Sequence, residues 1–202
     1  MTNVYLVDDH PLILNTLASI LEESMCCSIV GQSSNFDEST IDELIHLNAE
    51  LVILDVSMPT IDSFDLVPLL KKRVPYIKII IYTMHSLNRY YQHFMKLGVD
   101  GYLIKSNGFG NLVEAIEEVN IGNKYFPNSI LDSILKSDEK MEENQLQFTK
   151  FEKDVLSELS VSKNNKTIAD NLNCTVQKVL NTRQNLLIKT GTNNIDELLK
   201  TF

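Results

Sequence analysis

The strongest constraint on the fold is the alternation of five apolar runs with stretches of helical periodicity through the first part of the chain. The runs are rich in β-branched residues and lie at 4–7, 29–32, 51–55, 78–83 and 101–104. Amphipathic stretches follow them, at about 12–24, 39–47, 64–73, 87–97 and 108–119. A repeat of strand and helix predicts a parallel sheet covered by helices on both faces. We therefore expect a doubly wound (βα)5 domain of the α/β class.

The pattern changes after residue 122. A short helix is expected at 129–135, and residues 136–147 (KSDEKMEENQLQ) are polar and charged, as linkers are. Beyond them, four short helices are predicted at 150–159, 165–172, 176–189 and 195–200. The expected organisation is an α/β domain over 1–122, a linker over 123–147 and a smaller all-α domain over 148–202.

Charge is distributed unevenly along the chain, whose formal net charge is −9. Residues 148–202 hold 8 Lys and Arg against 6 Asp and Glu, a net charge of +2, so the excess of acid lies before them. An acidic surface repels nucleic acid, which places any DNA or RNA contact in the C-terminal domain. No apolar run approaches the roughly 18 to 20 residues of a membrane span. We expect a cytoplasmic protein without membrane contact.

Polar residues follow four of the predicted strands, at the edge where a parallel sheet binds ligands. Asp8 and Asp9 follow the first strand, Asp55 ends the third, Thr83 ends the fourth and Lys105 follows the fifth. Crowded carboxylates require a compensating cation, and an all-oxygen site suits Mg²⁺, which keeps waters and bridges to phosphate. A carboxylate also attacks phosphorus, giving an acyl phosphate whose oxygens the metal, Lys105 and Thr83 would stabilise.

The motifs around these residues resemble the receiver domain of two-component response regulators. They are Val7-Asp8-Asp9-His10-Pro11, Leu54-Asp55-Val56-Ser57-Met58-Pro59, Thr83, and Gly98-Val99-Asp100-Gly101-Tyr102-Leu103-Ile104-Lys105. The resemblance covers residues 1–122 and implies a sensor histidine kinase as partner.

The resemblance also assigns roles to individual residues. It implies Asp55 as phosphoacceptor, and direct Mg²⁺ ligation by Asp9, Asp55 and the backbone carbonyl of Ser57, with Asp8 acting mostly through water. Thr83 and Tyr102 fall on the family's switch positions.

Turnover of an external substrate is not expected. Haloacid-dehalogenase-like phosphatases also form an aspartyl phosphate, but the second Asp of their DxDx[TV] motif is a general acid, which Asp55-Val56-Ser57 lacks. We expect no enzyme activity beyond Mg²⁺-dependent self-phosphorylation and autodephosphorylation. Turnover of a small phosphate ester would instead identify a phosphatase.

Two of the C-terminal helices have the spacing of a helix-turn-helix, with Asn164 and Thr175 as predicted N-caps. Residues 148–202 resemble the DNA-binding domain of NarL/LuxR-type regulators. The matching stretches are Phe148-Thr149-Lys150-Phe151-Glu152-Lys153-Asp154-Val155-Leu156, Asn165-Lys166-Thr167-Ile168-Ala169, and Val179 through Arg183 to Lys189-Thr190-Gly191. Leu180 replaces a Lys that commonly contacts DNA, so we expect weaker attraction to phosphates.

Candidate DNA contacts lie mainly on the second of these helices. Gln177, Asn181 and Gln184 share a face, and Asn and Gln can bond adenine bidentately, although solvated polar positions would show the same pattern. Basic residues interpreted as phosphate contacts, which position the helix without reading sequence, are Lys166, Lys178, Arg183 and Lys189. The apolar stripe of the final helix either forms a dimer interface or packs within its own domain.

The sequence thus predicts a response regulator in which phosphorylation on Asp55 controls dimerisation and sequence-specific binding to promoter DNA. The alternative is a receiver whose output is mainly protein–protein interaction, with weak or absent DNA binding.

Overall fold

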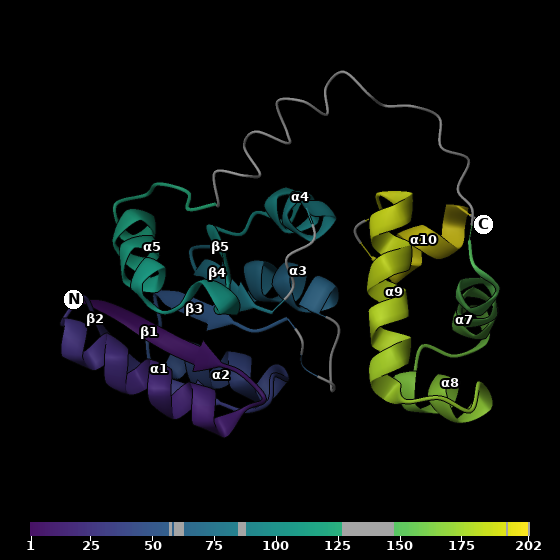
Figure 1. The fold of residues 1–202 in the computed structure, drawn as a ribbon, viewed down its shortest axis with the longest axis horizontal. Coiled ribbons are helices and arrows are strands. Elements are labelled where there is room, and N and C mark those ends of the chain that lie inside the picture. Colours follow the sequence, from purple (N-terminus) through teal and green to yellow (C-terminus); the bar gives the residue numbers. More distant parts are fainter. Residues whose placement is uncertain (57, 59–62, 85–87, 127–147, 193, 202) are drawn as a thin grey trace, which may run out of the picture. The chain divides into compact units, whose positions relative to one another are not determined.

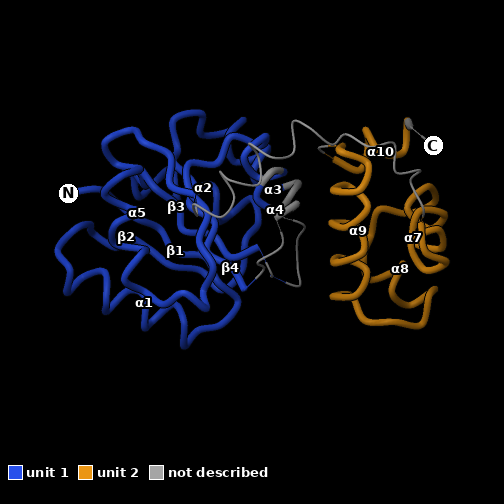
Figure 2. The backbone as a smooth tube through the Cα atoms, turned by 45° about the horizontal axis from the view of Figure 1, so that its top comes forward, with its two compact units in different colours: residues 1–136 blue, residues 137–202 orange. Residues whose placement is uncertain are grey.

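The computed structural model describes residues 1–56, 58, 63–84, 88–126, 148–192 and 194–201. The chain forms two compact units, Met1–Lys136 and Ser137–Phe202, which are described separately (Figure 2). The expected linker, apart from its first residues, and its short helix at 129–135 lie outside the described residues, and the domain boundaries at 122 and 147 stay predictions. No helix in the described part of the chain is long and apolar enough to cross a bilayer.

A parallel sheet of five strands, in the order β2-β1-β3-β4-β5, forms the centre of the N-terminal unit (Figure 1). The strands are β1 (Thr2–Val7), β2 (Cys27–Ser33), β3 (Leu51–Leu54), β4 (Lys78–Thr83) and β5 (Gly101–Ile104). All four residues of β3 are buried, as expected for a central strand covered on both faces. The predicted doubly wound α/β fold is confirmed.

Helices cover both faces of this sheet. The first face packs against α1 (Pro11–Ser24) and α5 (Gly110–Asn120), whose apolar residues share one buried cluster with alternate residues of the strands. The other face is covered by α2 (Glu38–His46), α3 (Ser63–Arg73) and α4 (Asn88–Lys96). On this face the Tyr5 hydroxyl donates to Glu43 of α2 at 2.8 Å, and Tyr102 packs on Tyr91 of α4.

The strand order reverses around β1, and this reversal positions the site. In open α/β sheets, ligands bind outside the carboxyl ends of the strands at such a point. Asp8 and Asp9 directly follow β1, and Asp55 directly follows β3, its neighbour in the sheet. The backbone N–H of Asp55 donates to the carbonyl of Val7 at 2.9 Å, which places the two chain ends side by side.

The carboxylate of Asp100 lies at the amino ends of β4 and β5, the edge of the sheet opposite the site, and bonds both strand and helix residues. Its Oδ2 accepts hydrogen bonds from the backbone N–H of Ile79 at 2.9 Å and from Nζ of Lys71 on α3 at 3.1 Å. Its Oδ1 accepts from Nζ of Lys124, which follows α5, at 2.9 Å. Asp100 therefore connects a strand, a helix and the segment after α5.

The described residues of the C-terminal unit form α7 (Lys150–Val161), α8 (Asn165–Asn171), α9 (Val176–Thr190) and α10 (Ile195–Thr201). The predicted helix-turn-helix comprises α8 and α9. Both predicted N-caps are confirmed, since the Asn164 side chain accepts from two backbone N–H groups of α8 and the Thr175 hydroxyl accepts from that of Lys178. Each cap satisfies donors that the first turn of a helix leaves free.

Candidate functional site

Lys105 lies between two buried carboxylates at the carboxyl edge of the sheet. Its Nζ is 2.5 Å from Oδ2 of Asp8 and 2.5 Å from Oδ2 of Asp55. The side chains of Lys105, Asp8 and Asp55 are only 6, 3 and 2% exposed. Removing Lys105 would leave the two buried carboxylates facing each other without this cation, which is destabilising. The structure thus brings together three residues that the sequence analysis had assigned to this edge.

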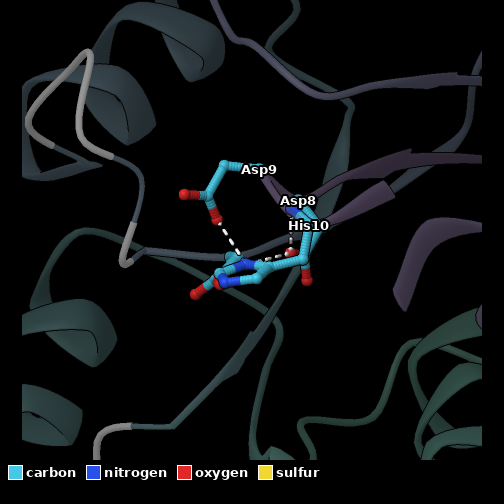
Figure 3. Close-up of side chains that lie close together, drawn as sticks. Asp8, Asp9 and His10 are labelled. Carbon is cyan, nitrogen blue, oxygen red and sulfur yellow. Dashed lines mark hydrogen bonds and ion pairs between the residues drawn. The ribbon is translucent and has the colours of Figure 1, made fainter. Parts of the chain in front are cut away.

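Asp9 and His10 lie at the mouth of the same site (Figure 3). Nδ1 of His10 is 3.2 Å from Oδ1 of Asp8 and 2.7 Å from Oδ1 of Asp9. The second contact lacks hydrogen-bond geometry, and Asp9 Oδ1 is buried without a hydrogen-bond partner among the described residues. One ligand atom each from Asp8, Asp9, His10 and Asp55 lies within 4.8 Å of the others.

These residues fit a divalent cation. Three carboxylates and one ammonium leave a net charge of −2 when all are ionised, and the unsatisfied oxygen of Asp9 is one that a cation would bind. Carboxylate oxygens are the ligands that Mg²⁺ prefers, together with retained waters. The backbone carbonyl of Ser57, also expected as a ligand, lies outside the described residues.

The two residues at the expected switch positions are fully buried. Thr83 ends β4, and Tyr102 lies on the neighbouring β5. The ring centroid of Tyr102 is 4.1 Å from that of Tyr91 and 5.9 Å from that of Phe94, both on α4. Such tilted aromatic pairs contribute about 0.5–1.5 kcal/mol each beyond their area burial. Tyr102 is therefore coupled by packing to α4.

The three polar residues expected to read bases differ in their surroundings. Gln177 Nε2 donates to Asn181 Oδ1 at 3.0 Å, and both side chains are half-buried. Gln184 is 3% exposed, and its Oε1 has no hydrogen-bond partner in the described chain. Bidentate contact with adenine uses both the donor and the acceptor of an amide. Such contact requires the Gln177–Asn181 bond to open and Gln184 to become accessible.

Arg183 is buried and holds α9 against α8. Its Nη1 donates to Oδ1 of Asn165, the first residue of α8, and to the backbone carbonyl of Lys163 at 3.3 Å. A phosphate contact by this guanidinium would compete with both bonds. Its contacts support a role in positioning the two helices.

The three lysines expected at phosphates are held differently. Nζ of Lys178 is 4.2 Å from the ring centroid of Phe151, and Nζ of Lys189 is 2.7 Å from a carboxylate oxygen of Glu152. Both partners lie on α7, whereas Lys166 is exposed on α8. Two of the lysines thus already have partners within the C-terminal unit.

Three side chains that prove important were not predicted from the sequence: His10, Tyr91 and Glu152. For Glu152 a signal was present, because Thr149 and Glu152 have the spacing of a capping box, which the structure forms at the start of α7. For His10 the signal was its position directly after two site carboxylates. For Tyr91 the sequence held no signal beyond the apolar character of its ring.

Comparison with known proteins identifies the family. Residues 4–117 match the family model of the response regulator receiver domain. The chain belongs to the response regulators. The resemblance to the NarL/LuxR type is also confirmed, because the similarity to regulators of this type extends through the helix-turn-helix unit.

Relatives match nearly the whole chain. The transcriptional regulatory protein MctR of Rhizobium johnstonii is 28% identical over 188 residues, which cover 93% of this chain and 86% of the relative. The response regulator UvrY of Escherichia coli K12 is 28% identical over 193 residues, covering 94% and 88%. Among solved structures, the chain is similar to RcsB from Salmonella enterica serovar Typhimurium bound to a promoter in the presence of the phosphomimetic BeF3⁻. The TM-score is 0.63 at 25% sequence identity, and the match covers 98% of this chain and 96% of that one.

Proposed function

We propose that this response regulator accepts a phosphoryl group on Asp55 with Mg²⁺ beside it, and that phosphorylation controls dimerisation and binding to promoter DNA. The observation that carries the proposal is the pairing of Asp55 and Asp8 through Lys105 at the point where the strand order reverses. The similarity to promoter-bound RcsB supports DNA as the target of the C-terminal unit. A receiver domain also implies a sensor histidine kinase as the phosphoryl source.

The positions of the residues support the following proposed parts in phosphoryl transfer. An oxygen of the Asp55 carboxylate forms a bond to phosphorus while the bond from phosphorus to the donor's leaving atom breaks. Lys105, already 2.5 Å from Asp55, is placed to pair with a phosphoryl oxygen after transfer. Asp8, Asp9 and Asp55, with the carbonyl of Ser57, would hold Mg²⁺, which when bound neutralises charge on the phosphoryl oxygens. Self-phosphorylation and autodephosphorylation are the only reactions proposed.

Thr83 and Tyr102 are proposed to transmit the change. The Thr83 hydroxyl would donate to a phosphoryl oxygen and move toward it, which alters the space available to the Tyr102 ring. Because that ring packs on Tyr91 and Phe94, its movement repacks α4. This is a switch between two packed arrangements, which a local charge can bias.

Promoter DNA would be contacted mainly by α9. Lys166, Lys178 and Lys189 are proposed to contact phosphates, and Gln177, Asn181 and Gln184 to read bases. Arg183, also expected at phosphate, would reach it only after its bond with Asn165 opened. A two-fold dimer would place two α9 helices in successive major grooves.

Labelling tests the acceptor. Incubation with acetyl phosphate and Mg²⁺ should add one phosphoryl group to the wild type, detectable by mass, and none to Asp55→Asn. Asp42→Asn is a matched control, because it removes an exposed carboxylate of α2 that pairs with Arg73, and it should label as the wild type does. Full labelling of Asp55→Asn, or labelling undiminished by a chelator, contradicts the assignment.

A second candidate output is binding to another protein, with weak or absent DNA binding. It is favoured by the intramolecular partners of Lys178, Arg183 and Lys189, which reduce the positive charge available to DNA. A gel shift at low salt, with and without BeF3⁻, on the DNA upstream of the chain's own gene separates the two. A shift strengthened by BeF3⁻ supports DNA as the target, and no shift in either condition supports a protein partner.

A further inference from the structure

The imidazole of His10 faces the carboxylate cluster, although the proposed phosphoryl transfer does not use it. Its Nδ1 lies 2.7 Å from Oδ1 of Asp9 and 3.2 Å from Oδ1 of Asp8 (Figure 3). The side chain is 63% exposed, so burial does not force the ring into this position. The ring adds a nitrogen atom to a set of candidate metal ligands that otherwise consists of carboxylate oxygens.

The local sequence limits where His10 can lie. His10 is the N-cap residue of α1, with φ −103° and ψ 101°, and Pro11 begins the helix. A proline disfavours the helical conformation in the residue before it, so Pro11 keeps His10 extended. The backbone N–H of His10 also donates to Oδ1 of Asp8 at 3.0 Å. The side chain therefore starts from a well-defined point at the mouth of the site.

Two separations between the candidate ligand atoms suit adjacent ligands of a single ion. Four candidate ligand atoms, including Nδ1 of His10, lie within 4.8 Å of one another. Ligands about 2.1 Å from an ion are roughly 3 Å apart when adjacent and roughly 4 Å apart when opposite. The distances from Nδ1 to Asp8 and Asp9 match those of adjacent ligands. The contact of Nδ1 with Asp8 at 3.2 Å has hydrogen-bond geometry, whereas the closer contact with Asp9 at 2.7 Å does not, so hydrogen bonding accounts for only one of the two contacts.

We propose that His10 is a nitrogen ligand of the receiver's cation site, and that it gives this site a preference for divalent transition ions such as Co²⁺ and Zn²⁺. Imidazole suits these ions, whereas carboxylate and water suit Mg²⁺. Mg²⁺ is held by the oxygen ligands without His10, and a transition ion adds the Nδ1 bond. The proposal rests on the proposed function, because it takes the carboxylates to hold a cation.

The test compares affinities for two ions in the full-length, metal-stripped protein at one fixed pH. Calorimetric titration with Co²⁺ and with Mg²⁺ is applied to the wild type, His10→Ala and His10→Gln. The control is His46→Ala, which removes an exposed histidine of α2. Both His10 variants should lose about tenfold or more in Co²⁺ affinity and change less than twofold toward Mg²⁺, and the control should match the wild type.

Nuclear magnetic resonance gives a direct readout of the ligand. The chain has only four histidines, so ¹⁵N-labelled histidine spectra are readily assigned with single-residue variants. Added Zn²⁺ should shift the Nδ1 resonance of His10. An unshifted resonance at saturating Zn²⁺, or equal Co²⁺ affinity in the wild type and both His10 variants, overturns the proposal and leaves the Mg²⁺ site standing. A wild type that binds no Mg²⁺ refutes the proposed function instead.

Discussion

Replacing Asp100 should destabilise the N-terminal unit by far more than the loss of a surface ion pair. Its carboxylate accepts one backbone N–H, from Ile79, and the ammonium groups of Lys71 and Lys124. Asp100→Ala removes all three bonds and leaves the N–H of Ile79 at the edge of β4 without this acceptor. Asp100→Asn keeps an oxygen for that N–H and removes only the charge.

The magnitude follows from these contacts. An unsatisfied backbone donor costs about 1–3 kcal/mol, and a hydrogen bond to a charged group contributes about 1.5–3 kcal/mol. Lys124 is 53% exposed, so its pair contributes at most about 1 kcal/mol. Each lysine keeps a backbone carbonyl acceptor at 2.7 Å, which limits the loss. We expect Asp100→Ala to lower the free energy of unfolding by about 3 kcal/mol, and Asp100→Asn by about 1 kcal/mol.

The difference between wild type and Asp100→Asn should depend on pH. Burial alone would raise the pKa of Asp100, but hydrogen bonds from Lys124 and Ile79 and the charge of Lys71 outweigh it and lower the pKa. A lowered folded-state pKa gives stabilisation that is complete above the unfolded-state pKa of about 4 and is lost as pH falls through the folded-state value. The difference should therefore be constant near neutral pH and shrink in acid.

Tyrosine fluorescence during urea unfolding measures this stability in the full chain. All seven tyrosines lie in the N-terminal unit, the last being Tyr125, and there is no tryptophan. The matched control is Asp42→Ala, which breaks an exposed pair with Arg73 and should cost less than about 0.5 kcal/mol. The reasoning is refuted if Asp100→Ala lowers the free energy of unfolding no more than the control does. It is also refuted if the difference in unfolding free energy between the wild type and Asp100→Asn persists in acid.

Three further predictions concern packing, DNA binding and switching. Gly31→Ala places a Cβ 2.5 Å from the Tyr5 ring and should lower the free energy of unfolding by about 1–3 kcal/mol, measured by the same fluorescence assay. An unchanged free energy of unfolding would show that the ring moves aside without cost. Glu152→Gln keeps the helix cap but removes the ion pair of Lys189, which becomes available to a phosphate. The slope of log affinity for DNA against log salt concentration should therefore steepen by about 0.9 for each protomer. A double variant that also carries Lys189→Gln should have the slope of the wild type. Thr83→Ala should retain most phosphorylation but lose the phosphorylation-dependent dimerisation seen by sedimentation, and dimerisation like the wild type's would place the switch elsewhere.

The receiver site was predictable because parallel strands place their carboxyl ends at one edge. Asp8, Asp55 and Lys105 are far apart in sequence, yet each directly follows a strand, so the sheet alone brings them together. The contact of Tyr102 with Tyr91 was not predictable in this way. It depends on the rotation and height of α4 over β5, which helical periodicity does not specify.

The C-terminal unit shows a different limit. Charge counting treated Lys189 as available to phosphate, because sequence reveals a charge but not its partner 37 residues away. The Glu152 carboxylate is mostly buried, and although burial alone would raise its pKa, the hydrogen bonds from Lys189 and Thr149 lower it, so it remains ionised beside the lysine. The helices themselves were predictable from caps and apolar spacing, whereas the direction of their long side chains was not.

These internal pairs bear on how phosphorylation can control DNA binding. A cation–π contact such as that of Lys178 with Phe151 contributes about 0.5–1 kcal/mol at an exposed site. A phosphate contact that replaces it must therefore be more favourable than this to add to the affinity for DNA. With a domain charge of only +2, one unit neutralises few phosphates, and its affinity should be low and weakly dependent on salt. Joining two units doubles the phosphate contacts and places two α9 helices on half-sites about one turn apart. Modest electrostatics in each unit thus make occupancy of a promoter depend on dimerisation, which is the step that phosphorylation of Asp55 is proposed to control.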